Sequence, residues 1–323
     1  MTYTRIIGTG SCLPARRVAN QELEARVDTT DSWIRERSGI AERRVAAAGE
    51  NCTELAVGSA RQALQAAGLG PWDVDLIVLA TSTPDRVFPS TACLVQDRLG
   101  CRPGIIAFDL AAACSGFTYA LDVADRFIRT GGARRALVIG AEVFSRILNW
   151  NDRGTCVLFG DGAGAVVVEA ADQPGILGSV LHADGAQEAM LNVPWGVGQG
   201  YDALTETSGK VSMRGGEVFK AAVRALGDIV DEMLERADLP RDAIDWLVPH
   251  QANIRIIAAT ARKLGLPMDR VVVTVERHGN TSAASIPLAL DEAMRDGRIR
   301  PGQLVLLEAF GAGFTWGANL IRF

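Results

Sequence analysis

Three side chains in this sequence could together carry out nucleophilic chemistry on a thioester. Cys114, in "AAACSGF", follows the strand-like run "IIAFDL" and comes directly before an amphipathic, helix-like segment. A cysteine at the start of a helix lies at the positive end of the helix dipole, which favours the thiolate, a good nucleophile. His250 in "VPHQAN" and Asn280 in "RHGNTS" can each donate a hydrogen bond to a thioester carbonyl and stabilise an enolate without a metal. Taken singly, each has an ordinary structural explanation, because free cysteines are usually buried and the other two fit a strand end and a turn.

The elements that must position these residues follow an α/β pattern. Amphipathic, helix-like segments alternate with strand-like runs, which is typical of α/β architecture. The strand-like runs cover residues 75–81, 105–110, 135–142, 163–170, 269–276 and 303–310. Ligand sites in α/β sheets favour the carboxyl ends of central strands, and Cys114 lies just beyond such an end.

The chain also repeats itself at an offset of about half its length. Two stretches recur, residues 64–82 as residues 234–252 and residues 120–142 as residues 289–310. The offsets, 234 − 64 = 170 and 289 − 120 = 169, nearly agree. They predict a duplicated α/β protein with halves at residues 1–172 and 173–323. The duplication places His250 at a strand end and Asn280 near the counterpart of Cys114, so we expect the three side chains to meet.

Composition and charge exclude several classes of function. The 323 residues carry 33 Lys and Arg against 38 Asp and Glu, a net charge of −5, so nothing global indicates a nucleic-acid or membrane partner. No apolar targeting segment and no stretch of membrane-spanning length is visible, so a cytoplasmic location is expected. The six cysteines and three histidines are not spaced as disulfides or as zinc ligands.

Five segments resemble the β-ketoacyl-[acyl-carrier-protein] synthase III family. They are "AAACSGFTYAL", "DRGTCVLFGDGAGAVV", "VPHQANIRI", "RHGNTSAAS" and "EAFGAGFTWG". The resemblance extends from "IIGTGSCLP" to the last residue. It implies a thiolase-like α/β fold with five layers, α/β/α/β/α, and the initiating condensation of type II fatty-acid synthesis. Acetyl-CoA and malonyl acyl carrier protein would be the substrates of a homodimer that needs no metal or other cofactor.

The resemblance also implies a role for each candidate residue. Cys114 would accept the acetyl group, and His250 and Asn280 would stabilise the carbanion that forms when the malonyl group loses CO₂. The oxyanion hole of the acyl-cysteine would use the backbone N–H groups of Cys114 and Ala312. Ala312 stands where the family pattern has the middle of three glycines, and a left-handed backbone there would be strained for alanine. His278 is interpreted as a loop histidine that supports its neighbours.

Three binding regions follow from the same resemblance. The CoA site would consist of Trp33, Arg37, Arg153, Phe219 and Asn253. Acyl carrier protein, which is strongly acidic, would dock on Gln251, Ala252, Asn253, Ile254, Arg255, Lys220, Arg262 and Lys263. The acyl pocket would be lined by Phe144, Phe159, Val211 and Met213, with Phe88 reaching across the dimer to close the partner's pocket. Phe144 stands where the family pattern has a smaller leucine, which indicates a short pocket and an acetyl-sized primer.

Two alternatives use the same residues. A related condensing enzyme of the thiolase fold could use other acyl-CoA primers in polyketide, quinolone or long-chain ketone synthesis. A catalytically silent acyl-binding partner subunit would usually lack the nucleophile, which is present here as Cys114. Elongating relatives have a second histidine where Asn280 stands, and a thiolase would have a second cysteine near residues 310–314, so both fit less well.

Overall fold

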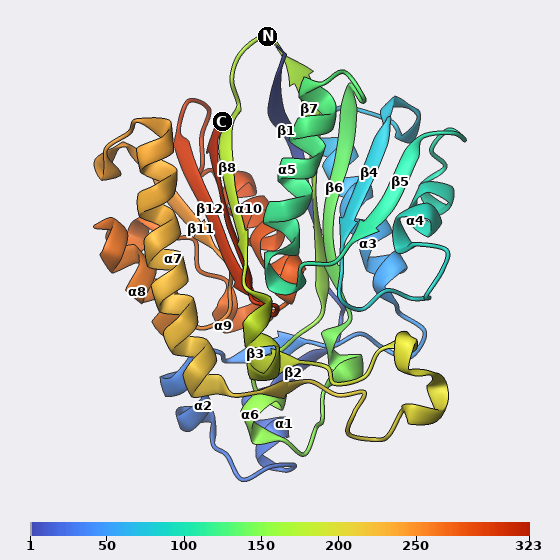
Figure 1. Cartoon of the computed structure of the whole chain (residues 1–323), viewed down its shortest axis with the longest axis vertical. Helices are drawn as coiled ribbons and strands as arrows, with labels where there is room; N and C mark the ends of the chain where they lie inside the picture. The colour runs from blue at the N-terminus through green and yellow to red at the C-terminus, as the bar shows by residue number, and fades with distance from the viewer. Residues whose placement is uncertain (1) are drawn as a thin grey trace.

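The computed structural model describes residues 2–323 and contains two large β-sheets side by side (Figure 1). The first sheet has the order β1-β7-β6-β4-β5, with β1 (Tyr3–Cys12), β7 (Gly162–Ala171), β6 (Arg135–Glu142), β4 (Leu76–Ala80) and β5 (Ile106–Leu110). The second has the order β11-β12-β13-β8, with β11 (Trp246–Pro249), β12 (Leu304–Gly311), β13 (Thr315–Arg322) and β8 (Ile176–Ala183). Both sheets are mixed, because β4 pairs in parallel with β5 and β6, and β11 with β12, while the remaining pairs are antiparallel.

The two sheets repeat one topology, as the sequence repeat predicts. Read from β8, the second sheet runs β8-β13-β12-β11, which corresponds to β1-β7-β6-β4 in the first. Strands β4 and β11 begin 170 residues apart, at Leu76 and Trp246, and β6 and β12 begin 169 residues apart, at Arg135 and Leu304. The expected boundary at residues 172 and 173 falls in the turn between β7 and β8, and the division into two domains stays a prediction.

The strand predicted at residues 269–276 is wrong. Only Val271 makes a β-bridge, to Leu247 of β11, and the following residues turn into the short helix α9 (Val275–His278). The side-chain amide oxygen of Gln251 accepts the backbone N–H groups of Thr274 and Val275 at 2.8 and 3.0 Å. A buried side chain therefore satisfies the donors that a β-ladder would have paired, and the segment need not continue as a strand.

Helices complete a five-layer arrangement in which two helices lie between the sheets (Figure 1). The central pair is α5 (Gly116–Arg129) and α10 (Ser285–Arg295), whose apolar side chains pack against both sheets in one core. Helices α3 (Cys52–Ala66) and α4 (Thr91–Leu99) cover the outer face of the first sheet, and α7 (Gly215–Ala237) and α8 (Ile254–Leu264) cover that of the second. Strands covered on both faces explain the nearly continuous apolar runs in the sequence.

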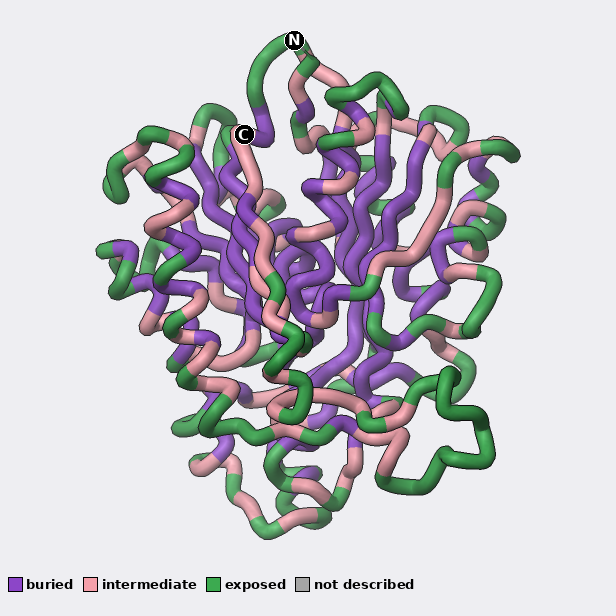
Figure 2. The backbone as a smooth tube through the Cα atoms, in the orientation of Figure 1, coloured by how far each residue is buried: buried purple, intermediate pink, exposed green. Residues whose placement is uncertain are grey.

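A smaller cap lies below the sheets in Figure 1. It contains β2 (Arg17–Ala19), α1 (Asn20–Glu24), α2 (Asp31–Ser38), β3 (Glu42–Arg44) and α6 (Arg153–Cys156). Beside it, the connection between the short strands β9 (Leu191–Asn192) and β10 (Ser212–Met213) forms a mostly exposed loop, seen in green at lower right in Figure 2. Among residues 2–323, no helix has the length and apolar character that crossing a membrane requires.

Candidate active site

Cys114 lies in a sharp turn between β5 and α5. Because β5 is the edge strand of the first sheet, the expectation that Cys114 follows a central strand is wrong within one chain. The turn is a 3-10 helix, Ala113–Ser115, and Ala113 has a φ angle of 45°, which is unusual for a residue with a side chain. Gly311, at the end of β12, lies so close that a Cβ atom there would be 2.7 Å from the backbone nitrogen of Cys114. The nucleophile candidate from the first half is thus packed directly against a strand of the second half.

His250 follows β11 and is held by two contacts. Its backbone N–H donates to the carbonyl of Glu308 at 2.7 Å, and its ring Nδ1 lies 2.6 Å from the hydroxyl oxygen of Ser285 at the start of α10. Burial lowers the pKa of His250 to about 3, because the charged imidazolium would lose its hydration. The ring is therefore neutral, with one N–H to offer.

Hydrogen bonds to backbone groups hold both the main chain and the side chain of Asn280. Its backbone N–H donates to the carbonyl of Leu158 at 2.8 Å, and its carbonyl accepts from Gly160 at 2.9 Å. The backbone N–H of Ser282, a residue with φ of 50°, donates to the side-chain Oδ1 at 2.8 Å. Since a backbone N–H can only donate, Oδ1 must face Ser282, and the NH₂ group of Asn280 is left to donate elsewhere.

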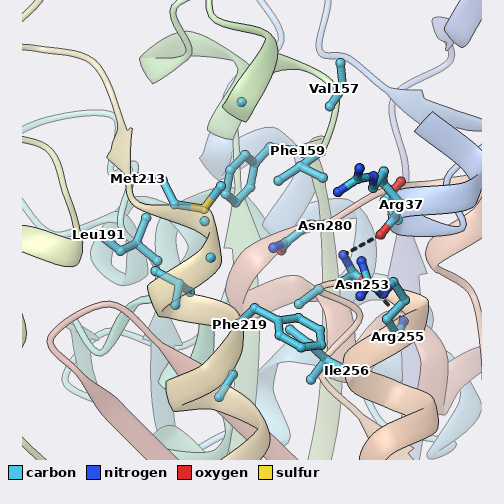
Figure 3. A pocket seen from close by; sticks show the side chains of 18 of the residues that line it. Arg37, Val157, Phe159, Leu191, Met213, Phe219, Asn253, Arg255, Ile256 and Asn280 are labelled. Atoms are coloured by element: carbon cyan, nitrogen blue, oxygen red, sulfur yellow. Dashed lines mark hydrogen bonds between the residues drawn. The ribbon is translucent and has the colours of Figure 1, made fainter. Parts of the chain in front are cut away.

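The three side chains line one cavity of about 570 Å³. Its wall combines residues of both halves, and Figure 3 shows Asn280 deep in it, between Phe159 and Phe219. The repeat-based expectation that Cys114, His250 and Asn280 meet is therefore confirmed in space, whereas their catalytic roles stay predictions. An apolar cavity with a thiol and two neutral donors suits the transfer of an acyl group and the stabilisation of a developing oxyanion.

Burial controls the ionisation of Cys114. It raises the pKa of the thiol to about 12, and the nearby Ser282 side chain opposes this increase only in part. The carboxylate of Glu142 adds to the increase. Desolvation therefore outweighs the start of α5, which by itself would favour the thiolate, and the group is a thiol before it reacts.

Glu142 is a buried carboxyl that the sequence reasoning missed. It accepts hydrogen bonds from the hydroxyls of Thr83 at 2.6 Å and Ser282 at 3.1 Å and from the backbone N–H of Ser82 at 3.1 Å. Burial raises the pKa of Glu142 to about 7, and these hydrogen bonds oppose the increase. Its position as the last residue of the apolar run "RALVIGAE" was the available signal, because a charged residue at a buried strand end needs an explanation.

Aromatic rings paired with arginines form the more exposed part of the cavity wall. The guanidinium carbons of Arg37 and Arg153 lie 5.7 and 4.8 Å from the ring centre of Trp33, and that of Arg255 lies 5.1 Å from the ring of Phe219. The side-chain NH₂ of Asn253 donates to the carbonyl of Arg37 at 3.0 Å, as the dashed line in Figure 3 shows. This arrangement offers flat faces and positive charge to a ligand that carries a heteroaromatic base and phosphates.

Comparison with known proteins identifies the family. Two family models match the chain, 3-oxoacyl-[acyl-carrier-protein (ACP)] synthase III over residues 108–185 and its C-terminal counterpart over residues 234–323. A curated relative from Alkalilimnicola ehrlichii, named beta-ketoacyl-[acyl-carrier-protein] synthase III, is 62% identical over 323 residues, which is 100% of both chains. The chain belongs to the β-ketoacyl-[acyl-carrier-protein] synthase III family. A second such relative, from Thioalkalivibrio sulfidiphilus, is 61% identical over 323 residues and also covers 100% of both chains.

Solved structures agree with this membership of the β-ketoacyl-[acyl-carrier-protein] synthase III family. The crystal structure of 3-oxoacyl-[acyl-carrier-protein] synthase III from Aquifex aeolicus VF5 superimposes with a TM-score of 0.93 at 48% sequence identity. The match covers 99% of this chain and 100% of that chain. The predicted thiolase-like five-layer fold and the condensing-enzyme assignment are therefore confirmed.

Gln251, which was predicted to dock the carrier protein in this synthase III chain, is buried. Gln251 is 1% exposed, and its NH₂ group donates to the carbonyls of Pro249 and Val272 while its oxygen accepts from two further backbone groups. All the hydrogen bonds of this side chain are made inside the protein, so Gln251 cannot contact a docked partner.

The other predicted docking residues stay candidates. Arg255 and Lys220 are exposed and line the cavity, whereas Ala252, Asn253 and Ile254 are half-buried. Arg262 and Lys263, in the last turn of α8, are also exposed. Lys263 is 3.0 Å from Asp231 of α7, so part of its charge is already neutralised.

Only some of the residues predicted to line the acyl pocket of this synthase III line the cavity. Phe159 and Met213 line the cavity, whereas Phe144 and Val211 lie outside its wall in a small apolar cluster. The ring of Phe144 stacks on that of Phe159 at 4.2 Å between centres and supports it from behind. Phe88 is 82% exposed and does not line the cavity of its own chain.

Two further expectations for this synthase III concern Ala312 and His278. Ala312 lies in the turn between β12 and β13, where the positive φ angle falls on Gly313, at 136°, and not on Ala312. The predicted strain at Ala312 is therefore absent. His278 is not a loop residue, because it is the last residue of α9. Its side chain is buried, and within residues 2–323 its Nδ1 atom has no hydrogen-bond partner. Within residues 2–323, no group of three or more His, Cys, Asp or Glu side chains is placed to hold a metal ion.

Proposed function

We propose that this β-ketoacyl-[acyl-carrier-protein] synthase III condenses the acetyl group of acetyl-CoA with malonyl acyl carrier protein and forms acetoacetyl carrier protein and CO₂. The observation that carries the proposal is the meeting of Cys114, His250 and Asn280 in one largely apolar cavity. A thiol next to two neutral hydrogen-bond donors fits a reaction with one covalent intermediate and one carbanion-like transition state.

In the first half-reaction the Cys114 sulfur attacks the acetyl carbonyl of acetyl-CoA. The new C–S bond forms while the C–S bond to CoA breaks, and the thiol proton ends on the departing CoA sulfur, so the step is neutral in protons. The backbone N–H of Cys114, together with a donor from the turn at Ala312, would hold the carbonyl oxygen. The close approach of Gly311 to Cys114 supports this, because it brings the β12–β13 turn next to the nucleophile.

In the second half-reaction the malonyl thioester loses CO₂. The electron pair of the broken C–C bond moves into the thioester, whose oxygen accepts hydrogen bonds from His250 and Asn280. The carbanion then attacks acetyl-Cys114, a C–C bond forms, and the released sulfur takes up a proton from solvent. Because the pKa of His250 is lowered to about 3, His250 acts here as a neutral donor and not as an acid.

Trp33, Arg37 and Arg153 would bind the adenine and phosphates of CoA, in keeping with the two guanidinium groups near the indole. Arg255, Lys220 and the more distant Arg262 would attract the acidic carrier protein to the same entrance.

The working form would be a homodimer in the cytoplasm. Strand β5 is at the edge of the first sheet, and the neighbouring loop exposes the apolar side chains of Val87 and Phe88, which are 59% and 82% exposed. An open strand edge beside exposed apolar side chains favours pairing with another chain. In such a dimer Phe88 would reach the acyl pocket of the partner.

The proposal is tested by intact-mass spectrometry after incubation with acetyl-CoA. We expect one acetyl adduct, mapped to Cys114, which disappears on addition of malonyl carrier protein as acetoacetyl carrier protein forms. Cys114→Ser is the matched control and should not form the adduct under the same conditions. Comparable kcat/KM for octanoyl-CoA would overturn acetyl-CoA as the primer, and no adduct with any acyl-CoA would overturn the covalent route.

A further inference from the structure

Ser285 makes a contact that serines in helices seldom make. It is the first residue of α10 and is 1% exposed, and its hydroxyl oxygen lies 2.6 Å from Nδ1 of His250. The other buried α-helical serines, Ser38 and Ser59, donate to a carbonyl of their own helix, Ser38 to Ile34 at 2.6 Å and Ser59 to Ala56 at 2.9 Å. No carbonyl within residues 2–323 accepts the hydroxyl proton of Ser285, so that proton is available to the histidine ring.

Two arrangements of this contact are chemically possible. If Ser285 donates to Nδ1, the ring proton of His250 sits on Nε2, and the ring can donate a hydrogen bond to a ligand in the cavity. If Nδ1 carries the proton and donates to Ser285, Nε2 becomes an acceptor and would repel a developing oxyanion. The second arrangement also leaves the buried Ser285 proton without an acceptor, which is unfavourable.

Asn280 has no such ambiguity. Its oxygen faces a backbone N–H, that of Ser282, which can only donate, so the amide orientation is built into the main chain. The orientation of His250 depends instead on one side-chain hydroxyl that can donate or accept. Of the two proposed donors in the cavity, only His250 can therefore be changed by substitution of a single neighbouring side chain.

We propose that Ser285 is a positioning residue that donates its hydroxyl proton to Nδ1 of His250 and so keeps the ring N–H on Nε2, directed at the reacting thioester. The inference rests on the proposed function, because it assumes that His250 stabilises the enolate. Ser285 itself touches no substrate and transfers no proton. Its influence is confined to the decarboxylation half-reaction, since acetylation of Cys114 does not need the His250 donor.

The experiment compares the two half-reactions in Ser285→Ala, Ser285→Thr and the control Ser59→Ala. Ser59 is also a buried helical serine, but its hydroxyl donates to Ala56 within α3, and it does not line the cavity. We expect Ser285→Ala to decarboxylate malonyl carrier protein about 10- to 100-fold more slowly while its rate of acetylation by acetyl-CoA is unchanged. Ser285→Thr, which keeps the hydroxyl, should recover most of the loss, and Ser59→Ala should change neither rate.

A spectroscopic measurement on the unsubstituted enzyme provides a second test. Ring-nitrogen chemical shifts of isotope-labelled histidine distinguish the two neutral tautomers, and the spectrum of His250→Ala identifies the signals of His250. A proton on Nε2 in the unsubstituted enzyme, moving toward a mixture in Ser285→Ala, supports the proposal.

Three results would overturn the inference: a proton on Nδ1 in the unsubstituted enzyme, equal losses in both half-reactions of Ser285→Ala, or no loss in either. Failure of the unsubstituted enzyme to decarboxylate malonyl carrier protein would instead overturn the proposed function.

Discussion

Gly311 offers a direct test of how closely the second half of the molecule holds the nucleophile. An alanine Cβ at this position would lie 2.7 Å from the backbone nitrogen of Cys114, whereas ordinary contact begins at 3.4 Å. The turn that carries Cys114 must therefore retreat by 3.4 − 2.7 = 0.7 Å, because a Cβ atom is fixed to its own backbone and its partner is a backbone atom, so neither can rotate away. A misplacement of this size at a reacting atom is expected to slow acetylation about 10- to 100-fold.

The assay is single-turnover acetylation of Gly311→Ala by acetyl-CoA, followed by intact-mass spectrometry. Overpacking should also lower the free energy of unfolding by about 1–3 kcal/mol, so rates are compared at a temperature where both proteins are folded. Gly178→Ala, in β8, is the matched control, because its Cβ would meet only the flexible end of Met233, at 3.3 Å. Acetylation of Gly311→Ala at the unsubstituted rate would refute the close packing of β12 against Cys114.

Further predictions concern His250, Glu308 and Trp33. His250→Ala should slow decarboxylation about 100- to 1000-fold and leave acetylation intact, and equal losses would contradict its role. Because burial lowers the pKa of His250 to about 3, decarboxylation by the acetylated enzyme should not change near the ordinary histidine pKa of about 6.5, where a step would contradict a neutral donor. Burial raises the pKa of Glu308 from 4.5 to about 8, and the nearby Thr260 side chain opposes this increase only in part, so the folded protein holds a proton that the unfolded chain releases. The contribution of Glu308 to the free energy of unfolding should therefore fall as the pH rises from 4.5 to 8, and in urea titrations Glu308→Gln should lose less stability over this range than the unsubstituted protein. Trp33→Ala should raise KM for acetyl-CoA about tenfold with little change in KM for malonyl carrier protein, and equal effects on both would contradict a CoA site at Trp33.

The meeting of the three site residues could be predicted because it follows from topology. The repeat aligned the strand before His250 with residues 75–81 and placed Asn280 near the counterpart of Cys114, so local patterns were enough to predict that these strand ends lie close together. The same patterns failed for residues 269–276, where valines favour a strand but the Gln251 side chain takes the backbone donors. That contact joins separate elements, and no local pattern contains it.

The ionisation and hydrogen-bond partners of buried side chains could not be predicted from the sequence either. The helix end suggested a thiolate at Cys114, yet the pKa of that thiol is raised by desolvation, which is set by all the layers around it. Glu142 and Ser285 look like ordinary strand-end and helix-start residues until their partners are known. Gln251 stands beside Asn253 in a motif that faces a cavity, but its side chain turns inward.

The two positive φ angles near the site follow the internal repeat of the chain. Ala113 and Ser282, with φ angles of 45° and 50°, are separated by 282 − 113 = 169 residues, the same offset as β6 and β12. Both halves therefore carry one positive-φ turn directly before the helix that lies between the sheets, and these two turns pack against each other. The site, with the thiol on one turn and the amide beside the other, is thus built across the pseudo-twofold contact between the two halves, and each half supplies a different chemical group there.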